Sequence, residues 1–263
     1  MIRIVRAEWR KLRRPTLLVG TLVASFFFSG LFSSLLFLLI DSPQGNSDRG
    51  RVISREILEL PQGVVQGFSS VSSLLGIIAL CVFAAQTAQE YSYGTLRNLL
   101  VRQPRRLLLL LGKLVSMALF ALAMVVTSLI AAVGSQAFFA PRKDVSTEQW
   151  FTGDGRHFIY QTFGNVLLAT ILFGIIGMAL GILLRSSITA ISIAVVWILI
   201  IESLLTAVRP SVEKWLPGAL LSAVGQGGTS TLEYQRSLIA ALLIGAVVAT
   251  LSASLFAKRD VSQ

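Results

Sequence analysis

One acidic side chain interrupts an otherwise apolar stretch of the sequence, residues 188–208. Ionisable groups inside membrane-spanning segments are rare and often mark a transport path, because burying a charge in lipid is unfavourable. Glu202 is therefore a candidate for such a path. Hydroxyl-bearing side chains in the same stretch and in the stretch 64–88 could line the path with it. The candidate translocation-path residues are Ser69, Ser73, Ser192, Glu202 and Thr206.

A structural role is the alternative for these polar residues. Glu202 lies only about one helical turn before the outer end of its stretch, so it could reach the membrane interface. It could also pair with Arg209 or Arg236. Serines in spans often satisfy their hydroxyls on the backbone of their own helix.

The sequence lacks the residue sets of several enzyme classes. The P-loop pattern G-x-x-x-x-G-K-[ST] is absent, since the one Gly-Lys pair, Gly112-Lys113, is followed by Leu114. The single histidine, His157, excludes a paired-histidine metal motif, and the single cysteine, Cys81, excludes an internal disulfide. No G-x-S-x-G nucleophile motif occurs. We expect no catalytic residue, metal or cofactor in this chain, and therefore no enzyme.

The composition indicates a membrane protein. The 263 residues are 54% hydrophobic and only 14% charged, with a mean hydropathy of +0.74. Soluble domains carry about 25% charged residues, so this chain cannot cover a soluble surface. A net charge of +10 would suggest nucleic acid for a soluble protein, but here we interpret it as a signal of membrane topology. No nucleic-acid partner is expected.

Six apolar stretches are long enough to cross a bilayer, which needs about 20 residues per helix. The first is too long for the apolar core of a signal peptide, about 7–15 residues. The sequence thus predicts an all-α polytopic membrane protein with a single transmembrane domain, residues 1–263. The predicted spans are 16–40, 64–88, 107–133, 159–184, 188–208 and 237–257.

The distribution of charge predicts the orientation. If the N-terminus is inside, the inner segments hold fourteen Lys and Arg against three acids, whereas the outer segments hold nine against nine. Basic residues concentrate in cytoplasmic loops, so both termini are expected in the cytoplasm and the protein in the cell membrane.

Three segments outside the spans carry structure of their own. Residues 1–15 alternate apolar residues with arginines at helical spacing, which predicts an interfacial helix that anchors to lipid or touches a cytoplasmic partner. Residues 54–60 could form a short outer helix. The segment 209–234 includes an apolar part too short to span, and it is predicted to be interfacial or re-entrant.

The inner loop 89–104 predicts a short amphipathic helix across the inner surface. Gly94 permits a sharp turn, Thr95 can cap the helix, and Pro104 ends it. An apolar ridge with basic edges suits docking into a groove of a partner protein, although an interfacial helix would show the same pattern. The ridge is Leu96, Leu99 and Leu100, and the basic residues are Arg97 and Arg102.

This loop and its flanks resemble the type-2 permeases of ATP-binding-cassette (ABC) exporters. The matching positions are Glu90, Gly94-Thr95-Leu96, Leu99-Leu100, Pro104, Arg106 and Lys113. The six-span layout, the inner termini and the basic N-terminal segment are also similar, and the chain has the length of the stand-alone permease type. The final span and the segment 209–234 match only by layout.

The resemblance implies a mechanism and partners. Two permeases, two copies or a copy and a paralogue, would form the path, and two separate ATPase subunits would bind ATP and magnesium. The loop helix would be the coupling helix that transmits closure of the ATPases, and Glu90 would pair with a basic group nearby or on a partner. The implied ATPase-coupling residues are Glu90, Gly94, Thr95, Leu96, Arg97, Leu99, Leu100 and Arg102.

Other functions remain open from the sequence. An ion-coupled secondary transporter could use Glu202, although the chain shows no repeat symmetry and no paired intramembrane acids. A membrane scaffold is also compatible. The small residues Gly174, Gly177 and Gly181 predict close helix packing, more simply within one chain than across a dimer. The transported substrate cannot be deduced from these residues.

Overall fold

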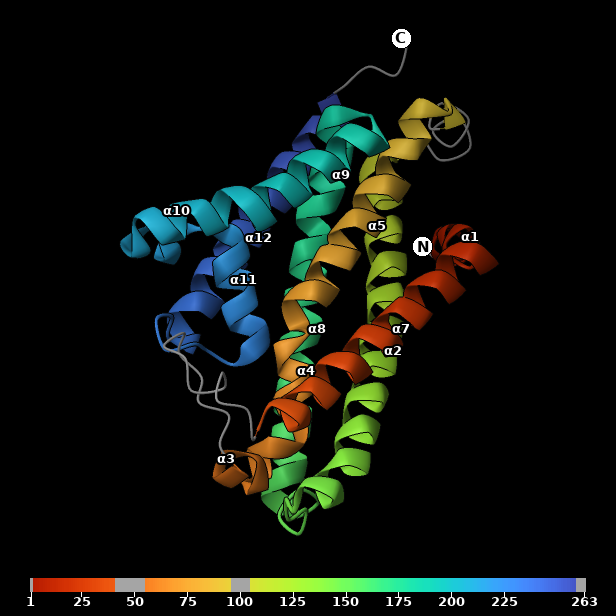
Figure 1. The fold of residues 1–263 in the computed structure, drawn as a ribbon. Coiled ribbons are helices and arrows are strands. Elements are labelled where there is room, and N and C mark those ends of the chain that lie inside the picture. The colour runs from red at the N-terminus through yellow and green to blue at the C-terminus, as the bar shows by residue number, and fades with distance from the viewer. Residues whose placement is uncertain (1, 41–54, 96–104, 259–263) are drawn as a thin grey trace.

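The computed structural model describes residues 2–40, 55–95 and 105–258, and this part of the chain is helical, with no strand among the described residues. Six helical segments are long and apolar enough to cross a membrane. They form an elongated bundle, with α8 at its centre in Figure 1. Their bounds are Pro15–Leu39, Pro61–Ser92, Arg106–Lys143, Gly153–Leu184, Ser187–Val208 and Tyr234–Phe256.

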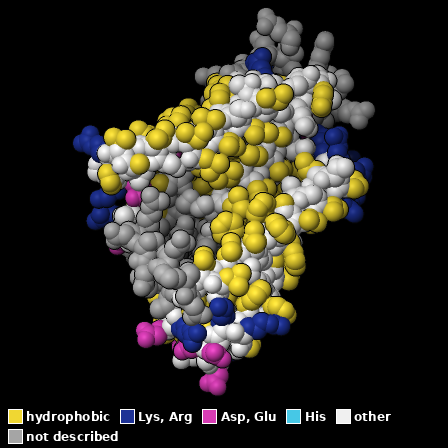
Figure 2. Space-filling model, viewed as in Figure 1, with side chains coloured by type: hydrophobic (Ala, Val, Ile, Leu, Met, Phe, Trp, Pro, Cys, Tyr) yellow, Lys and Arg dark blue, Asp and Glu magenta, His cyan; other side chains and the backbone are white. Residues whose placement is uncertain are grey.

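These six segments confirm the predicted multi-pass membrane protein. The segments are α2 (Pro15–Leu39), α5 (Ser72–Ser92) with its lead-in, α7 (Arg106–Phe139), α8 (Gly153–Leu184), α9 to α10, and α12 (Tyr234–Lys258). Their outward faces are apolar, with long side chains such as Val23 and Phe27 of α2 exposed. Figure 2 shows hydrophobic side chains along the bundle and charged ones mainly at its extremities. Exposed apolar helix faces of this length are stable in lipid.

Two of the six segments are not continuous α-helices. The second begins as a 3₁₀ turn, η2 (Pro61–Val65), and a short helix, α4 (Gln66–Ser70), before α5. The fifth consists of α9 (Ser187–Val195), a π-helical stretch, η4 (Val196–Ile201), and α10 (Glu202–Val208). In Figure 1 this fifth segment crosses the bundle rather than following it, and α10 packs mainly against its neighbours in the chain.

The remaining elements lie at the ends of the spans. α1 (Ile2–Leu12) precedes α2, and α3 (Arg55–Glu59) precedes η2. The segment 209–234 folds into a 3₁₀ turn, η5 (Pro210–Trp215), and a helix, α11 (Pro217–Gln226). α11 packs against α8 and α12 and buries most of its residues, so this helix is part of the helical core, whereas no residue of η5 is buried.

Glycines let α5 and α8 pack closely. A Cβ on Gly177 would lie 2.2 Å from the backbone oxygen of Leu80, and one on Gly174 would lie 2.3 Å from the Phe83 ring. The contact is reciprocal, since a Cβ on Gly76 of α5 would meet the ring of Phe173. Small residues allow this close approach of helix backbones. The glycine pattern of α8 therefore serves packing within the chain.

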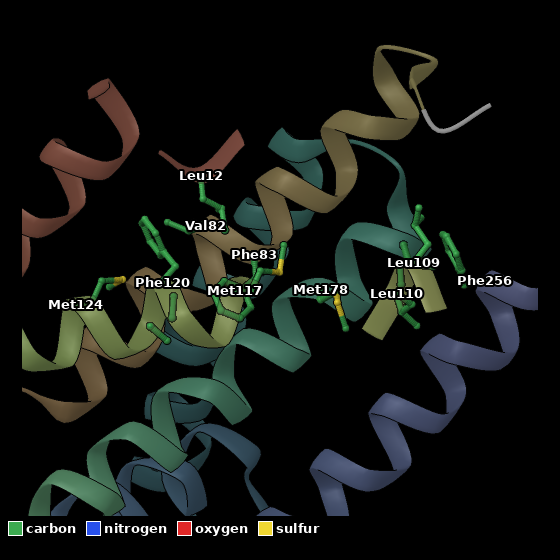
Figure 3. Packing of buried hydrophobic residues seen from close by; sticks show 13 residues of the cluster. Leu12, Val82, Phe83, Leu109, Leu110, Met117, Phe120, Met124, Met178 and Phe256 are labelled. Atoms are coloured by element: carbon green, nitrogen blue, oxygen red, sulfur yellow. The ribbon is translucent and has the colours of Figure 1, made fainter. Parts of the chain in front are cut away.

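One buried cluster joins α1 to the bundle. Leu12 packs with side chains of α5, α7 and α8, and Phe256 adds the end of α12. The cluster thus draws on α1, α5, α7, α8 and α12, and Figure 3 shows Phe83, Phe120 and Met178 among its side chains. The N-terminal helix is thus packed on the core at the end of the bundle where α5 ends and α7 begins, and we call this end the α1 end.

The glycine packing makes a direct prediction. Gly177→Ala places a Cβ against a backbone atom that cannot rotate away, so we expect a loss of about 1–3 kcal/mol in the free energy of unfolding. Gly164→Ala is the matched control. Gly164 lies in the same helix as Gly177, and a Cβ there meets nothing within 4 Å. Reversible unfolding of both variants in mixed micelles, followed by circular dichroism, measures the difference. Equal stability of the two would contradict the close α5–α8 contact.

Candidate functional site

Four charged side chains meet at the α1 end of the bundle. Lys113 Nζ of α7 lies 2.6 Å from Glu90 Oε1 of α5 and 2.9 Å from Glu8 Oε2 of α1. Lys11 Nζ of α1 lies 2.6 Å from Glu8 Oε1 and 2.7 Å from Glu90 Oε1. Each ammonium group bridges both carboxylates, so three helices are tied together by one network. We call Glu8, Lys11, Glu90 and Lys113 the ion quartet.

The ion quartet is buried and its charges balance. Glu8, Glu90 and Lys113 each expose 6% or less of their surface, while the Lys11 side chain exposes 32%. Buried charges are tolerated when they are paired and hydrogen-bonded, and removal of one partner leaves an uncompensated charge in a medium of low dielectric constant. With two acids and two bases, no net charge is buried, and each charged group depends on the others.

The local sequence explains why α1 reaches this position. Gly112 lies where α1 crosses α7, and a Cβ there would be 2.5 Å from Cγ2 of Ile4. One turn later, the Ser116 hydroxyl donates a hydrogen bond of 3.1 Å to the backbone oxygen of Val5. Glu8 and Lys11 are three residues apart, so both lie on the face of α1 that meets this crossing.

Electrostatics favour the ionised form of Glu8. Burial by itself raises the pKa of this carboxyl group, but the charges of Lys113 and Lys11 and their hydrogen bonds lower it further than burial raises it. The pKa of Glu8 therefore lies below its ordinary value of 4.5. The carboxylate remains charged at neutral pH and keeps its bonds to both lysines.

The structure describes only part of the predicted coupling segment. Glu90 lies in the last turns of α5 and faces the ion quartet, so its basic partners lie within this chain. Gly94 has a left-handed φ of +64°, as its predicted turn requires, and Thr95 donates a 3.4 Å hydrogen bond to the backbone oxygen of Glu90. The other implied residues, Leu96, Arg97, Leu99, Leu100 and Arg102, lie outside the described residues.

Sequence reasoning did not single out Glu8 and Lys11. Both lie in a helix with many arginines, so their side chains look like part of one solvent-exposed charged face. The available signal was Glu8 itself, an acid in a basic helix, three residues before a lysine.

Glu202 is held by three hydrogen bonds. Its Oε1 accepts from the backbone N–H of Gly218 at 2.9 Å and from the Trp197 indole at 3.0 Å, and its Oε2 accepts from the N–H of Ala219 at 3.0 Å. Gly218 and Ala219 stand in the first turn of α11, behind Pro217, so the carboxylate caps this helix and complements its dipole. Arg236, considered as a partner from the sequence, instead pairs with Glu233 at 3.3 Å.

The π-helical stretch η4 brings Trp197 to Glu202. Residues five apart point in different directions on an α-helix with 3.6 residues per turn. A π-turn closes on the fifth residue, so these two side chains align along the same face. The irregularity in this span therefore aligns the indole donor with the carboxylate that holds α11.

The candidate path residues separate into different environments. An open groove of about 610 Å³ is lined by Ser73, Glu202 and Thr206, with Ser203 and Ser222 beside them. Ser69 lies instead at a separate polar pocket, and Ser192 is exposed on α9. The groove thus brings together three of the five predicted residues. Among the residues that the structure describes, no group of three or more His, Cys, Asp or Glu could hold a metal ion.

Comparison with known proteins identifies one family. A family model described as "Protein of unknown function (DUF2705)" matches residues 49–262, which is most of the chain and includes Glu90, Lys113 and Glu202. No curated protein matches.

The ion quartet predicts a large effect from the loss of one charge. Lys113→Met leaves two buried carboxylates to share Lys11, so we expect a loss of about 3–5 kcal/mol in the free energy of unfolding. A second change, Glu90→Gln, restores the balance of charge, and the double variant should be more stable than the sum of the single losses predicts. Denaturation in mixed micelles measures all three variants.

Lys214→Met is the control for this series, because Lys214 is exposed on η5. A change at such a site is expected to stay within about 0.5 kcal/mol. If Lys113→Met is no more damaging than this control, the ion quartet contributes no stability.

The lowered pKa of Glu8 predicts the sign of a pH effect. A carboxyl group whose pKa is lowered by folding stabilises the protein above its unfolded pKa, and this contribution is lost as the pH falls through the lower folded value. The stability difference between wild type and Glu8→Gln should therefore be constant near neutral pH and shrink below about pH 4.5. Unfolding measured between pH 7 and pH 3 gives this difference. A difference that grows on acidification would contradict the assignment.

Proposed function

The chain belongs to the DUF2705 family, whose function is unknown, and we propose that it is the permease subunit of an ATP-driven exporter. It would form the substrate path as a dimer, with a second copy or a paralogue. Separate ABC ATPase subunits, two per complex, would bind ATP and magnesium and would couple to the permease through the loop between the second and third spans. The chain itself would carry out no catalysis.

The ion quartet is the observation that carries this proposal. Glu90 lies near the end of α5, which ends at Ser92, and Lys113 lies in the second turn of α7, which begins at Arg106. Because these two residues are bonded to each other, a force on the segment between them acts on both helices at once. Their bonds to Glu8 and Lys11 extend this connection to α1. A rigid, contiguous network is one physical means of carrying a movement from a bound partner to the spans.

The charge distribution supports the orientation that coupling needs. ATP is cytoplasmic, so the α1 end should face the cytoplasm. Most of the Lys and Arg of the chain lie in segments on that side of the spans, as the positive-inside rule requires.

The groove at Glu202 is the proposed path. It lies between the fifth segment, α5 and α11, and its hydroxyl groups and carboxylate offer polar contacts inside an otherwise apolar protein. The fifth segment is mostly exposed, which leaves a long apolar face for a second permease or for lipid.

An ion-coupled secondary transporter is the second candidate, because Glu202 lines the groove. The three hydrogen bonds of its carboxylate favour a structural role instead. Release of those bonds on protonation would free the first turn of α11, so an ion-coupling role would require α11 to move in each cycle.

Co-purification tests the proposal. The tagged chain is extracted from native membranes in a mild detergent, and the ATPase that accompanies it is identified and its ATP turnover measured. We expect a stoichiometric ABC ATPase that is lost or uncoupled in Leu99→Asp with Leu100→Asp. The control is Leu60→Asp, which changes an exposed leucine that lies outside both the coupling loop and the six membrane-spanning segments.

Two results would overturn the proposal. The first is a stable protein that brings down no ATPase, and the second is normal coupling in the Leu99/Leu100 variant. Uptake or efflux driven by a proton or sodium gradient alone, and abolished in Glu202→Gln, would establish the secondary transporter instead.

A further inference from the structure

A second polar site lies at the opposite end of the bundle from the ion quartet. A cavity of about 220 Å³ opens between the start of the second segment, the first turns of α8 and the end of α11. Four of its side chains are glutamines, and Asn165, Thr162 and Ser69 add further polar groups. The glutamines are Gln62, Gln66, Gln161 and Gln226.

The carboxamides of this cavity are available to a ligand. Among the residues that the structure describes, the side-chain amides of Gln66, Gln161 and Gln226 make no hydrogen bond. Each amide offers two N–H donors and a carbonyl acceptor. Gln66 and Gln226 are half-buried and Gln161 is exposed, so these amides are solvated and can exchange water for the polar groups of a ligand.

Asn165 is buried at the cavity, and a hydrogen bond holds its side chain in one orientation. It exposes only 8% of its surface, and its Oδ1 accepts a 2.7 Å hydrogen bond from the Tyr234 hydroxyl. With the oxygen occupied, the remaining Nδ2 group faces the turn at Gly227 and the cavity. A buried donor is therefore held in place and directed at whatever fills the space.

The lining selects the charge of the ligand. None of the described residues around the cavity is ionisable, so a charged ligand would lose its hydration without an opposite charge to replace it. A neutral ligand whose groups both donate and accept hydrogen bonds matches carboxamides on all sides. Phe158 adds one aromatic wall, against which an apolar ring face can lie.

We propose that this cavity binds an uncharged, hydroxyl-rich ring, a saccharide unit, with Asn165, Gln161, Gln66 and Gln226 bonding its hydroxyls and Phe158 packing on its face. The enclosed volume suits a compact ring better than an extended peptide. The sugar could arrive free in solution or as the headgroup of a neutral glycolipid. This binding site requires neither an ATPase nor transport, so it goes beyond the proposed function and can fail or hold independently of it.

Binding to the isolated chain tests the proposal. The protein is placed in phosphatidylcholine nanodiscs, free of sugar detergents, and titrated with maltose and methyl glucoside by saturation-transfer NMR. A parallel sample contains a diglucosyl diacylglycerol, whose retention is measured by native mass spectrometry. We expect saturable binding in at least one arm, and the arm that responds identifies the source of the sugar.

Three variants locate the site. Asn165→Leu and Gln161→Leu should each weaken binding about tenfold, equivalent to about 1.4 kcal/mol. Gln161 is exposed and bonds to nothing described, so its variant keeps the test valid if Asn165→Leu fails to fold. Gln235→Leu, an exposed glutamine outside the cavity, should leave binding unchanged.

Three outcomes would overturn the proposal. These are no saccharide binding in either arm, binding that is unaffected by Gln161→Leu, and binding of inorganic phosphate or an uncharged dipeptide amide in preference to both sugars.

Discussion

Two carboxylates and the ammonium group of Lys113 can be buried in this bundle only together with the partly exposed ammonium group of Lys11. Any one of them alone would carry a large desolvation penalty, whereas the ion quartet presents a neutral, fully bonded unit to its surroundings. The rest of the α1 end follows from this constraint. α1 must lie across α7, Gly112 must be small enough to admit it, and α5 must extend far enough for Glu90 to arrive. The apolar cluster around Leu12 then closes over the charges.

The opposite half of the molecule uses a single charge differently. The Glu202 carboxylate is compensated by N–H groups instead of cations, and it holds the first turn of α11 against the fifth segment. Glycine contacts between α5 and α8 supply the rigid centre between the two sites. The bundle is thus held together in three places. Ion pairs connect the helices at one end, the carboxylate of Glu202 caps α11 at the other, and α5 and α8 pack closely between them.

The sequence predicted six spans because hydrophobicity and length determine them, and each of the six segments overlaps its expected range. The third segment extends beyond the predicted end to Lys143, and the fourth begins before the predicted start, at Gly153. Glu90 was expected to pair with a basic group, and Lys113 was named only as a position that matches the permease pattern. Glu8 and Lys11 were not identified, because Glu8 meets the other two only through the crossing of α1 and α7. The hydrogen bonds of Glu202 to α11 could not be predicted from the sequence either. Its bonds depend on the fold of α11, a segment whose apolar run is too short to give a clear periodic signal.

The π-helical stretch before Glu202 has a consequence for how this protein tolerates change in chain length. Deleting one residue from 198–201 and relaxing the stretch to α-helical geometry would leave Trp197 and Glu202 four residues apart, which still places them on one face. Inserting a further residue there would instead rotate everything after it by about 100° relative to α9, and the carboxylate would turn away from α11. We therefore expect single-residue insertions in this stretch to be far less tolerated than single-residue deletions.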